Sequence, residues 1–358
     1  MRGVAITAIG AFTPVGINVA HTMGSLLTKL QWFDDLDITG GDGEPLTGAR
    51  VRLRSVEEGV DRYLAITQFA LGECLRESAS QPDGAGRGAG QSLRAPLPLL
   101  LATSEQRNLP CPAEELLDRV LEAHGDVWDR ARSRVFAGGK AGSIKALVAA
   151  EGLLRDREVG ACYVGGVDTL LDPVRLYELL DAGRLLEGGG TGSDGFIPGE
   201  AAVFLRLEAQ RAPTAQVTIQ GSAVCEGPGW APGAALANAG IAALAEATRA
   251  ASALVAVTHD GSGNQPSFEE LALALTHLPF GGGTSLLPWA PALSVGETGA
   301  AAAWLELAMA AFFLRENVFA GPVLSCLTSE GTARAAIVLG IDRGGRSGAS
   351  SSSEGHRG

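Results

Sequence analysis

Three short stretches of the sequence hold side chains that could carry nucleophilic or acid–base chemistry. They are GGKAGS at 138–143 with Lys140 and Ser143, HDGSGN at 259–264 with His259 and Asp260, and PALSVGETGAAAA at 291–303 with Glu297. A hydroxyl or amine needs a base beside it to become a nucleophile, and a buried carboxylate with a raised pKa can be that base. No obvious base accompanies Ser143 in the sequence, so the stretches form a candidate site only if the fold brings them together.

Each of these residues also has a structural interpretation. Ser143 is typical of a helix-capping or packing serine. A single histidine at a strand end, such as His259, often only hydrogen-bonds its neighbours. Glu297 precedes a small-residue helix, where the helix dipole favours a carboxylate.

The cysteines and histidines predict no metal and no cofactor. None of the five cysteines has a metal-ligand spacing, and the histidines are scattered. Cys162 lies in a predicted buried strand and Cys326 near the last loop, where a free cysteine packs as a small hydrophobe. The glycine-rich stretch at 84–90 follows a polar loop instead of a strand, so it is a poor nucleotide fingerprint.

Composition narrows the function further. The formal net charge is −12, which argues against nucleic acid as a partner. No apolar run reaches the length of a membrane span, and the N-terminus lacks the pattern of a signal peptide. Five cysteines without a disulfide pattern fit a reducing compartment. We therefore expect a cytoplasmic globular protein.

Hydrophobic patterns predict one α/β architecture built twice. Apolar strands at 3–10 and 215–221 each open a series of helices and strands, and strands at 201–207 and 334–341 close them. These series predict an N-terminal half at 1–210 and a C-terminal half at 211–342. The Ser/Gly-rich stretch at 343–358 is predicted to be a disordered tail.

Three motifs resemble the β-ketoacyl synthase family in order and spacing. They are GVAITAIGAFTPVG at 3–16, GGVDTLLDP at 165–173 and SDGFIPGEAAVFLRLE at 193–208. The resemblance implies a thiolase-like five-layer αβαβα fold with two similar halves. It also implies a dimer or pseudo-dimer, and a site where the two halves meet.

The resemblance also implies that the residues of the family reaction have been lost. Lys140 occupies the position of the nucleophilic Cys, and Glu297 that of the second His. His259 aligns with the first His, or Asp260 begins a different loop there. The final oxyanion loop reads LTSEG at 327–331. The remaining candidates for a ligand pocket are Ser143, Asp260, Glu200, Cys326 and Thr328; in the family, the glutamate that Glu200 matches supports the site without reacting.

The leading hypothesis is a catalytically inactive synthase-like protein that acts as a binding or scaffold subunit. It would bind an acyl ligand, an acyl carrier protein or another protein, as a homodimer or as a heterodimer with a synthase-like subunit. It resembles the chain-length factors of type II polyketide synthases, although those usually carry Gln where Lys140 stands. One alternative is an active 3-oxoacyl synthase or acyltransferase with altered catalytic residues. Another is an accessory factor of a type VI secretion effector locus, suggested by the stretch from Asp260 to Glu270.

Overall fold

The structure is a computed structural model. It describes residues 3–41, 43–53, 58–80, 95–187, 194–210, 216–227, 232–247, 254–278 and 288–342. The predicted tail at 343–358 and the glycine-rich stretch at 84–90 lie outside these residues.

Most of the described strands belong to one mixed sheet. Its order is β10-β9-β11-β12-β8-β1-β7-β6-β4-β5, and β2 and β3 form a separate hairpin. The strands are β1 (Val4–Phe12), β2 (Asp34–Thr39), β3 (Pro45–Gly48), β4 (Leu99–Thr103), β5 (Arg134–Ala137), β6 (Ala161–Thr169), β7 (Glu200–Ala209), β8 (Val217–Glu226), β9 (Ala256–His259), β10 (Pro288–Trp289), β11 (Val323–Leu327) and β12 (Ala333–Ile341).

The two halves of the sheet have the same topology. In the first half, β7 pairs antiparallel with both β1 and β6, and β6, β4 and β5 run parallel. In the second half, β12 pairs antiparallel with both β8 and β11, and β11, β9 and β10 run parallel. The predicted duplication is therefore confirmed as a fold. The boundary between residues 210 and 211 stays a prediction.

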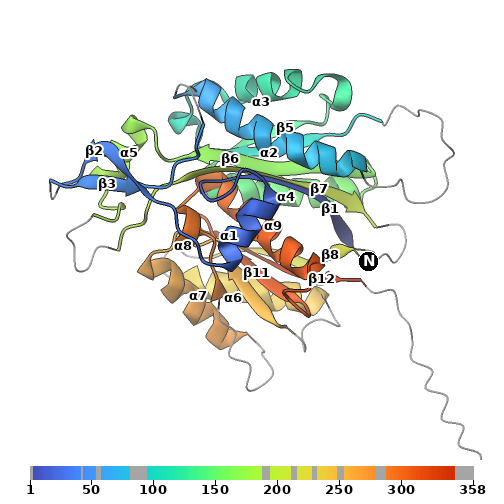
Figure 1. Ribbon diagram of the computed structural model, residues 1–358. Helices are drawn as coiled ribbons and strands as arrows, with labels where there is room; N and C mark the ends of the chain where they lie inside the picture. The colour runs from blue at the N-terminus through green and yellow to red at the C-terminus, as the bar shows by residue number, and fades with distance from the viewer. Residues whose placement is uncertain are drawn as a thin grey trace, which may run out of the picture.

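Helices cover both outer faces of the sheet and fill the space between its halves. In Figure 1, α2 and α3 lie above the sheet, α6 and α7 below it, and α1, α4 and α9 between. The helices are α1 (Val19–Leu27), α2 (Val60–Ser80), α3 (Ala113–Glu122), α4 (Gly139–Arg155), α5 (Pro173–Asp181), α6 (Pro232–Glu246), α7 (Gln265–His277), α8 (Ala292–Val295) and α9 (Ala302–Arg315), with 3-10 turns at Gln106–Asn108, Gly125–Val127 and Gly299–Ala301.

Three apolar clusters hold these layers together. One packs α2 and α3 on the first half of the sheet, and another packs α6 and α7 on the second half. The largest surrounds α4 and α9 between the two halves. All residues of α9 except Phe312 and Arg315 are buried, as expected for a helix that is apolar on every side. The five-layer prediction is thus confirmed.

The two halves separate along β1. This strand pairs with β8 only from Val4 to Ile6. Beyond that point, two glutamates of α2 take the place of a neighbouring strand: Glu77 Oε2 accepts a hydrogen bond from Ile9 N at 2.7 Å, and Glu73 Oε2 accepts one from Ala11 N at 3.1 Å. The two glutamates thus satisfy backbone donors of β1 that β8 does not pair.

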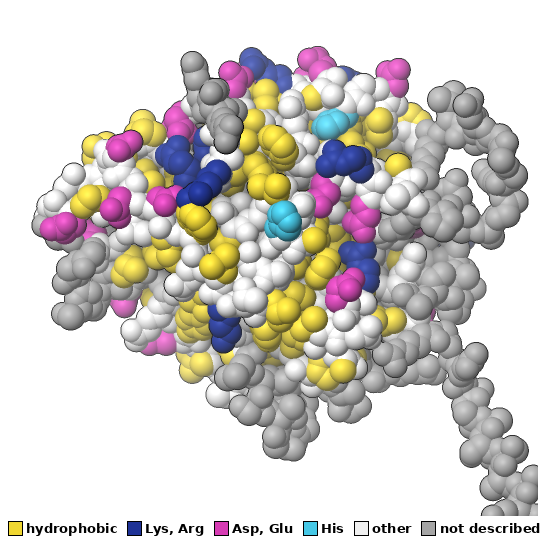
Figure 2. Space-filling view, in the orientation of Figure 1, with side chains coloured by type: hydrophobic (Ala, Val, Ile, Leu, Met, Phe, Trp, Pro, Cys, Tyr) yellow, Lys and Arg dark blue, Asp and Glu magenta, His cyan; other side chains and the backbone are white. Residues whose placement is uncertain are grey.

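The surface carries charges of both signs. On the face shown in Figure 2, Lys and Arg side chains are interspersed with Asp and Glu. None of the described helices is long and apolar enough to cross a membrane.

Candidate functional site

Lys140 lies at the start of α4, directly after the edge strand β5. The turn into the helix is tight: Gly139 has a φ of +55°, and a Cβ at Gly142 would lie 2.5 Å from Phe136 O. Glycine is therefore needed at both positions. The turn directs Lys140 inward, where only 3% of it is exposed.

Lys140 is held by two groups from the second half of the chain. Its Nζ lies 2.8 Å from Glu297 Oε2 in a buried ion pair, and it donates a hydrogen bond of 2.6 Å to Asp260 O. Burial by itself would lower the pKa of Lys140, but the charges of Glu297, Asp260 and Glu330 outweigh it and raise the pKa above its ordinary value. Lys140 is thus a protonated ammonium, which has no lone pair for nucleophilic attack.

Glu297 is fixed from several sides in the turn between α8 and α9. Its backbone N donates to Ile197 O at 2.7 Å, and its backbone O accepts from Gly199 N at 2.8 Å. Its Oε1 accepts from Gly299 N at 2.8 Å, leaving Oε2 for Lys140. The segment at 193–208 therefore positions the carboxylate that neutralises Lys140.

Asp260 follows β9 and is anchored by the last loop. Its Oδ1 accepts hydrogen bonds of 2.8 Å from both N and Oγ1 of Thr328. Burial raises the pKa of Asp260, although the charge of Lys140 and the bonds from Thr328 oppose this. In the stretch at 259–264, it is the backbone carbonyl of Asp260 that contacts Lys140.

His259 faces a different side of β9. Its ring lies 6.4 Å from that of Phe268 on α7, and its Nδ1 accepts a hydrogen bond of 3.2 Å from Gly261 N. Successive strand residues face opposite sides, and Thr258 faces α9. Burial, followed by the charges of Lys140 and Arg334, lowers the pKa of His259 to about 3. The imidazole is therefore neutral.

The other candidate residues serve packing and hydrogen bonding. Ser143 Oγ donates to Ala300 O at 2.7 Å, which ties α4 to the turn before α9. Glu200 forms a buried ion pair with Arg62, with Nε to Oε2 at 2.7 Å, and accepts from Val51 N at 2.8 Å. Cys326 packs in the cluster under α6 and α7 instead of facing α4.

The buried thiols are protonated. Burial raises the pKa of Cys162 to about 12, and it raises that of Cys326 well above its ordinary value. Neither thiol contacts Lys140 or Glu297. Within the described ranges, no group of three or more His, Cys, Asp and Glu side chains is arranged to hold a metal ion.

Sequence reasoning missed two buried acids beside this site. Glu306 of α9 is fully buried and accepts a hydrogen bond from Thr258 Oγ1. Burial raises its pKa well above the ordinary value, and the charge of Asp260 raises it further. A lone Glu inside the apolar run at 300–314 is the signal that could have identified it.

The second missed acid is Asp168, within the GGVDT stretch. Its Oδ1 accepts from Ser104 Oγ and its Oδ2 accepts from Ala300 N at 2.8 Å. Burial raises the pKa of Asp168 to about 6. Ala300 accepts from Ser143 and donates to Asp168, so one backbone turn connects this acid to α4.

Comparison with known proteins identifies the fold of this chain. No family model matches the chain, and neither does any curated protein. One chain of a complex between a type II polyketide synthase acyl-carrier protein and its ketosynthase superposes with a TM-score of 0.74 at 14% identity, over 95% of this chain and 99% of that one. A ketosynthase in complex with its chain length factor from Xenorhabdus doucetiae gives 0.69 at 15% identity, over 95% and 98%. A β-ketoacyl synthase from Burkholderia phymatum gives 0.66 at 14% identity, over 96% and 100%.

The chain therefore has the thiolase-like fold of the ketosynthases. This confirms the fold that the three sequence motifs implied.

Proposed function

We propose that this protein is a catalytically inactive ketosynthase-like subunit that acts by binding a synthase-like partner or an acyl carrier protein. The observation that carries the proposal is the buried contact of Lys140 with Glu297 and Asp260. In this contact, Lys140 and Glu297 stand where the family resemblance implies the thiolate and the second imidazole.

The electrostatics of these residues argue against condensation chemistry. Acyl transfer needs a deprotonated nucleophile, and the reaction needs hydrogen-bond donors at the developing oxyanion. Lys140 is protonated, and the Glu297 carboxylate would repel an oxyanion. Ser143 uses its proton to bond the Ala300 backbone carbonyl, and in the described part of the chain its Oγ has no hydrogen bond to a basic side chain.

A partner subunit is supported by the free edge of the sheet. Among the described strands, β5 pairs only with β4, and its outer edge carries no other strand. An unpaired edge offers backbone donors and acceptors to another chain. Complexes of a ketosynthase with a chain length factor are among the structures similar to this chain. We propose that a second synthase-like chain pairs along β5.

A condensation assay tests the proposed inactivity. Purified protein is mixed with an acyl thioester and a malonyl-loaded carrier protein, and release of CO₂ and the 3-oxoacyl product is measured. The proposal predicts no turnover above the protein-free control. Turnover that the protein accelerates and that Lys140→Ala or Ser143→Ala abolishes would overturn it in favour of an altered acyltransferase.

Cross-linking tests the proposed interface for the homodimer. Arg134→Cys places a thiol on β5, and Leu273→Cys places one on the exposed face of α7 as a control. We expect a covalent dimer on oxidation of the first variant only. A dimer from neither variant, with a monomeric mass in sedimentation, would contradict self-association through β5 and leave a heterodimer as the form to test by co-expression.

A further inference from the structure

A pocket of about 890 Å³ lies at the end of α4 opposite Lys140. It opens between the last turn of α4 and the beginning of β1 and β8, where the two halves of the sheet meet. Lys140 and Arg155 are separated by roughly 20 Å along the helix, because an α-helix rises ~1.5 Å per residue. The pocket is therefore separate from the candidate site.

One end of the pocket is acidic. Ser222 brings two carboxylates together: its Oγ donates to Glu151 Oε2 at 2.8 Å, and its N donates to Glu246 Oε2 at 3.0 Å. Glu151 is only 8% exposed, and its Oε1 has no hydrogen-bond partner among the described residues. Burial raises the pKa of Glu151, although the hydrogen bond from Ser222 and the charge of Arg155 oppose this.

Arg155, the cation near this end, only partly offsets its two carboxylates. Arg155 Nη2 lies 4.0 Å from Glu151 Oε2, and half of the Arg155 side chain is exposed. Because Arg155 is half exposed and lies at the distance limit of an ion pair, its contact with the buried Glu151 contributes little. The acidic end is thus suited to an ammonium group that contacts Glu151 Oε1 and Glu246 directly.

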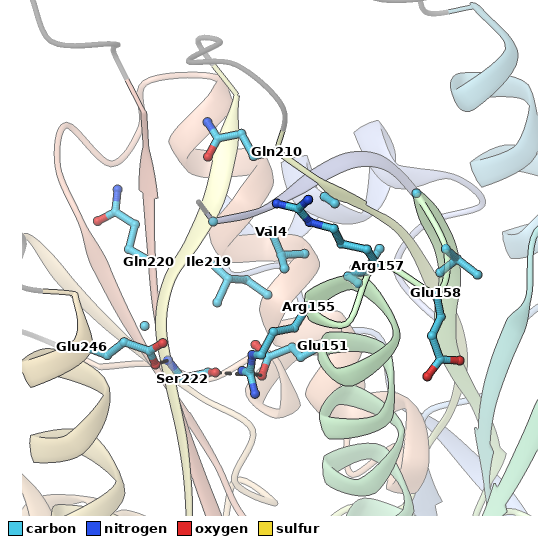
Figure 3. Close-up of a pocket in the computed structure, with 16 residues that line it drawn as sticks. Val4, Glu151, Arg155, Arg157, Glu158, Gln210, Ile219, Gln220, Ser222 and Glu246 are labelled. Atoms are coloured by element: carbon cyan, nitrogen blue, oxygen red, sulfur yellow. Dashed lines mark hydrogen bonds and ion pairs between the residues drawn. The ribbon is translucent and has the colours of Figure 1, made fainter. Parts of the chain in front are cut away.

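The opposite end of the pocket is basic. Figure 3 shows Arg157 and Gln210 at one end, and Glu246, Ser222 and Glu151 at the other. The described residues supply no ion-pair partner for Arg157. Val4 and Ile219 lie between the two ends in Figure 3 and form an apolar wall, and Leu154 also lines the pocket.

From this arrangement we propose that the pocket binds an ω-amino acid, with its ammonium at Glu151 and Glu246, its methylene chain along Val4 and Ile219, and its carboxylate at Arg157. A diamine would place its second charge beside Arg157, and a dicarboxylate would place one beside the glutamates. Charge complementarity at both ends therefore selects a molecule with opposite charges separated by an apolar chain.

Calorimetric titration tests this proposal with defined probes. The probes are 4-aminobutyrate and 6-aminohexanoate, with pentylamine and pentanoate carrying only one charge each. Glu246→Gln and Arg157→Gln each remove one end of the charge pattern. Glu158→Gln is the matched control, since this carboxylate points away from Glu246 and Ser222 in Figure 3.

We expect one of the ω-amino acids to bind at least about tenfold more tightly than either single-charge probe, because each lost charged contact typically costs a factor of ten or more. Glu246→Gln and Arg157→Gln should each weaken binding by a similar factor, and Glu158→Gln should leave it unchanged. Absence of binding at millimolar concentration, equal binding of pentylamine, or equal effects of all three substitutions would overturn the proposal.

Discussion

Lys140 and Glu297 form an ion pair that joins the two halves of the protein, with Nζ 2.8 Å from Oε2 and both side chains nearly fully buried. Lys140 starts the central helix of the first half, and Glu297 precedes the central helix of the second. A helix start disfavours a cation, because the dipole is positive there. The carboxylate of Glu297 and the carbonyl of Asp260 offset that cost, so the pair acts as a structural link between the halves.

Removal of one member of this pair should be strongly destabilising. Glu297→Gln leaves the Lys140 ammonium buried beside a neutral amide, and we expect the free energy of unfolding to fall by about 3–5 kcal/mol. Urea unfolding measures the change. The double variant Lys140→Met with Glu297→Gln should lose less than the sum of the two single losses, because it leaves no unpaired charge.

A surface pair on α3 provides the control for that experiment. Arg119 Nη2 lies 2.6 Å from Glu115 Oε1, and both side chains are nearly half exposed. Glu115→Gln should therefore change the unfolding midpoint very little. Equal losses from Glu115→Gln and Glu297→Gln would contradict the structural role of Lys140 and Glu297.

Two other buried glutamates should respond differently to the same substitution. Glu306 is protonated because burial raises its pKa, so Glu306→Gln exchanges one neutral group for another and should cost less than about 1 kcal/mol. Glu200 instead pairs with buried Arg62, and Glu200→Gln should cost about 3 kcal/mol or more. Thermal melting of both variants tests this order, and a larger loss for Glu306→Gln would contradict it.

Asp168 should make the protein less stable as pH rises. Its pKa is about 6 in the folded protein and near 4 in an unfolded chain, so between these values the folded state binds more protons. Its contribution is fully present below about pH 4 and lost as pH rises through about 6. The loss is of the order of 1–3 kcal/mol.

The Asp168→Asn variant isolates that contribution. An amide can donate to Ser104 or Tyr63 and accept from Ala300, as the protonated acid would. We therefore measure the free energy of unfolding of both proteins at pH 5 and at pH 7.5. The loss of stability between pH 5 and pH 7.5 should be smaller in the variant than in the unmodified protein. Identical pH dependence of the two proteins would contradict the raised pKa of Asp168.

A cysteine at position 140 should stay unreactive in this environment. Burial and the negative charges of Glu297 and Asp260, which act on this position, favour the protonated thiol. Lys140→Cys should therefore react with iodoacetamide more slowly than a cysteine in an unfolded peptide at pH 8, as peptide mapping of alkylation at position 140 would show. Adding Glu297→Gln should speed the reaction, and an unchanged rate would count against control by this carboxylate.

The sequence was informative about the layers and less so about the small elements. The apolar runs that form β1, β7, β8 and β12 open and close two similar series of helices and strands, so they predicted a duplicated α/β fold. The hairpin of β2 and β3 was missed because the strand DDLDIT is rich in aspartate, which strands disfavour. Its buried Leu36 and Leu46 pack on a small cluster under α5, a tertiary contact that local patterns do not show.

The candidate site was predicted as separate residues but not as an ion pair. Family spacing pointed to Lys140 and Glu297 one at a time, and a lysine at a helix start looked unfavourable by itself. The compensating contact depends on how the two halves pack, which no local spacing encodes. The same is true of Asp168 and Glu306, because the partners of each acid lie in other elements of the chain.

The most direct test of the account is intact-mass spectrometry of the protein after incubation with an acyl-loaded carrier protein. With Lys140 protonated and Ser143 bonded to Ala300 O, we predict no added acyl mass, while an active ketosynthase treated in parallel becomes acylated. An acyl adduct on this chain that disappears in Lys140→Ala or Ser143→Ala would contradict the account and identify the nucleophile.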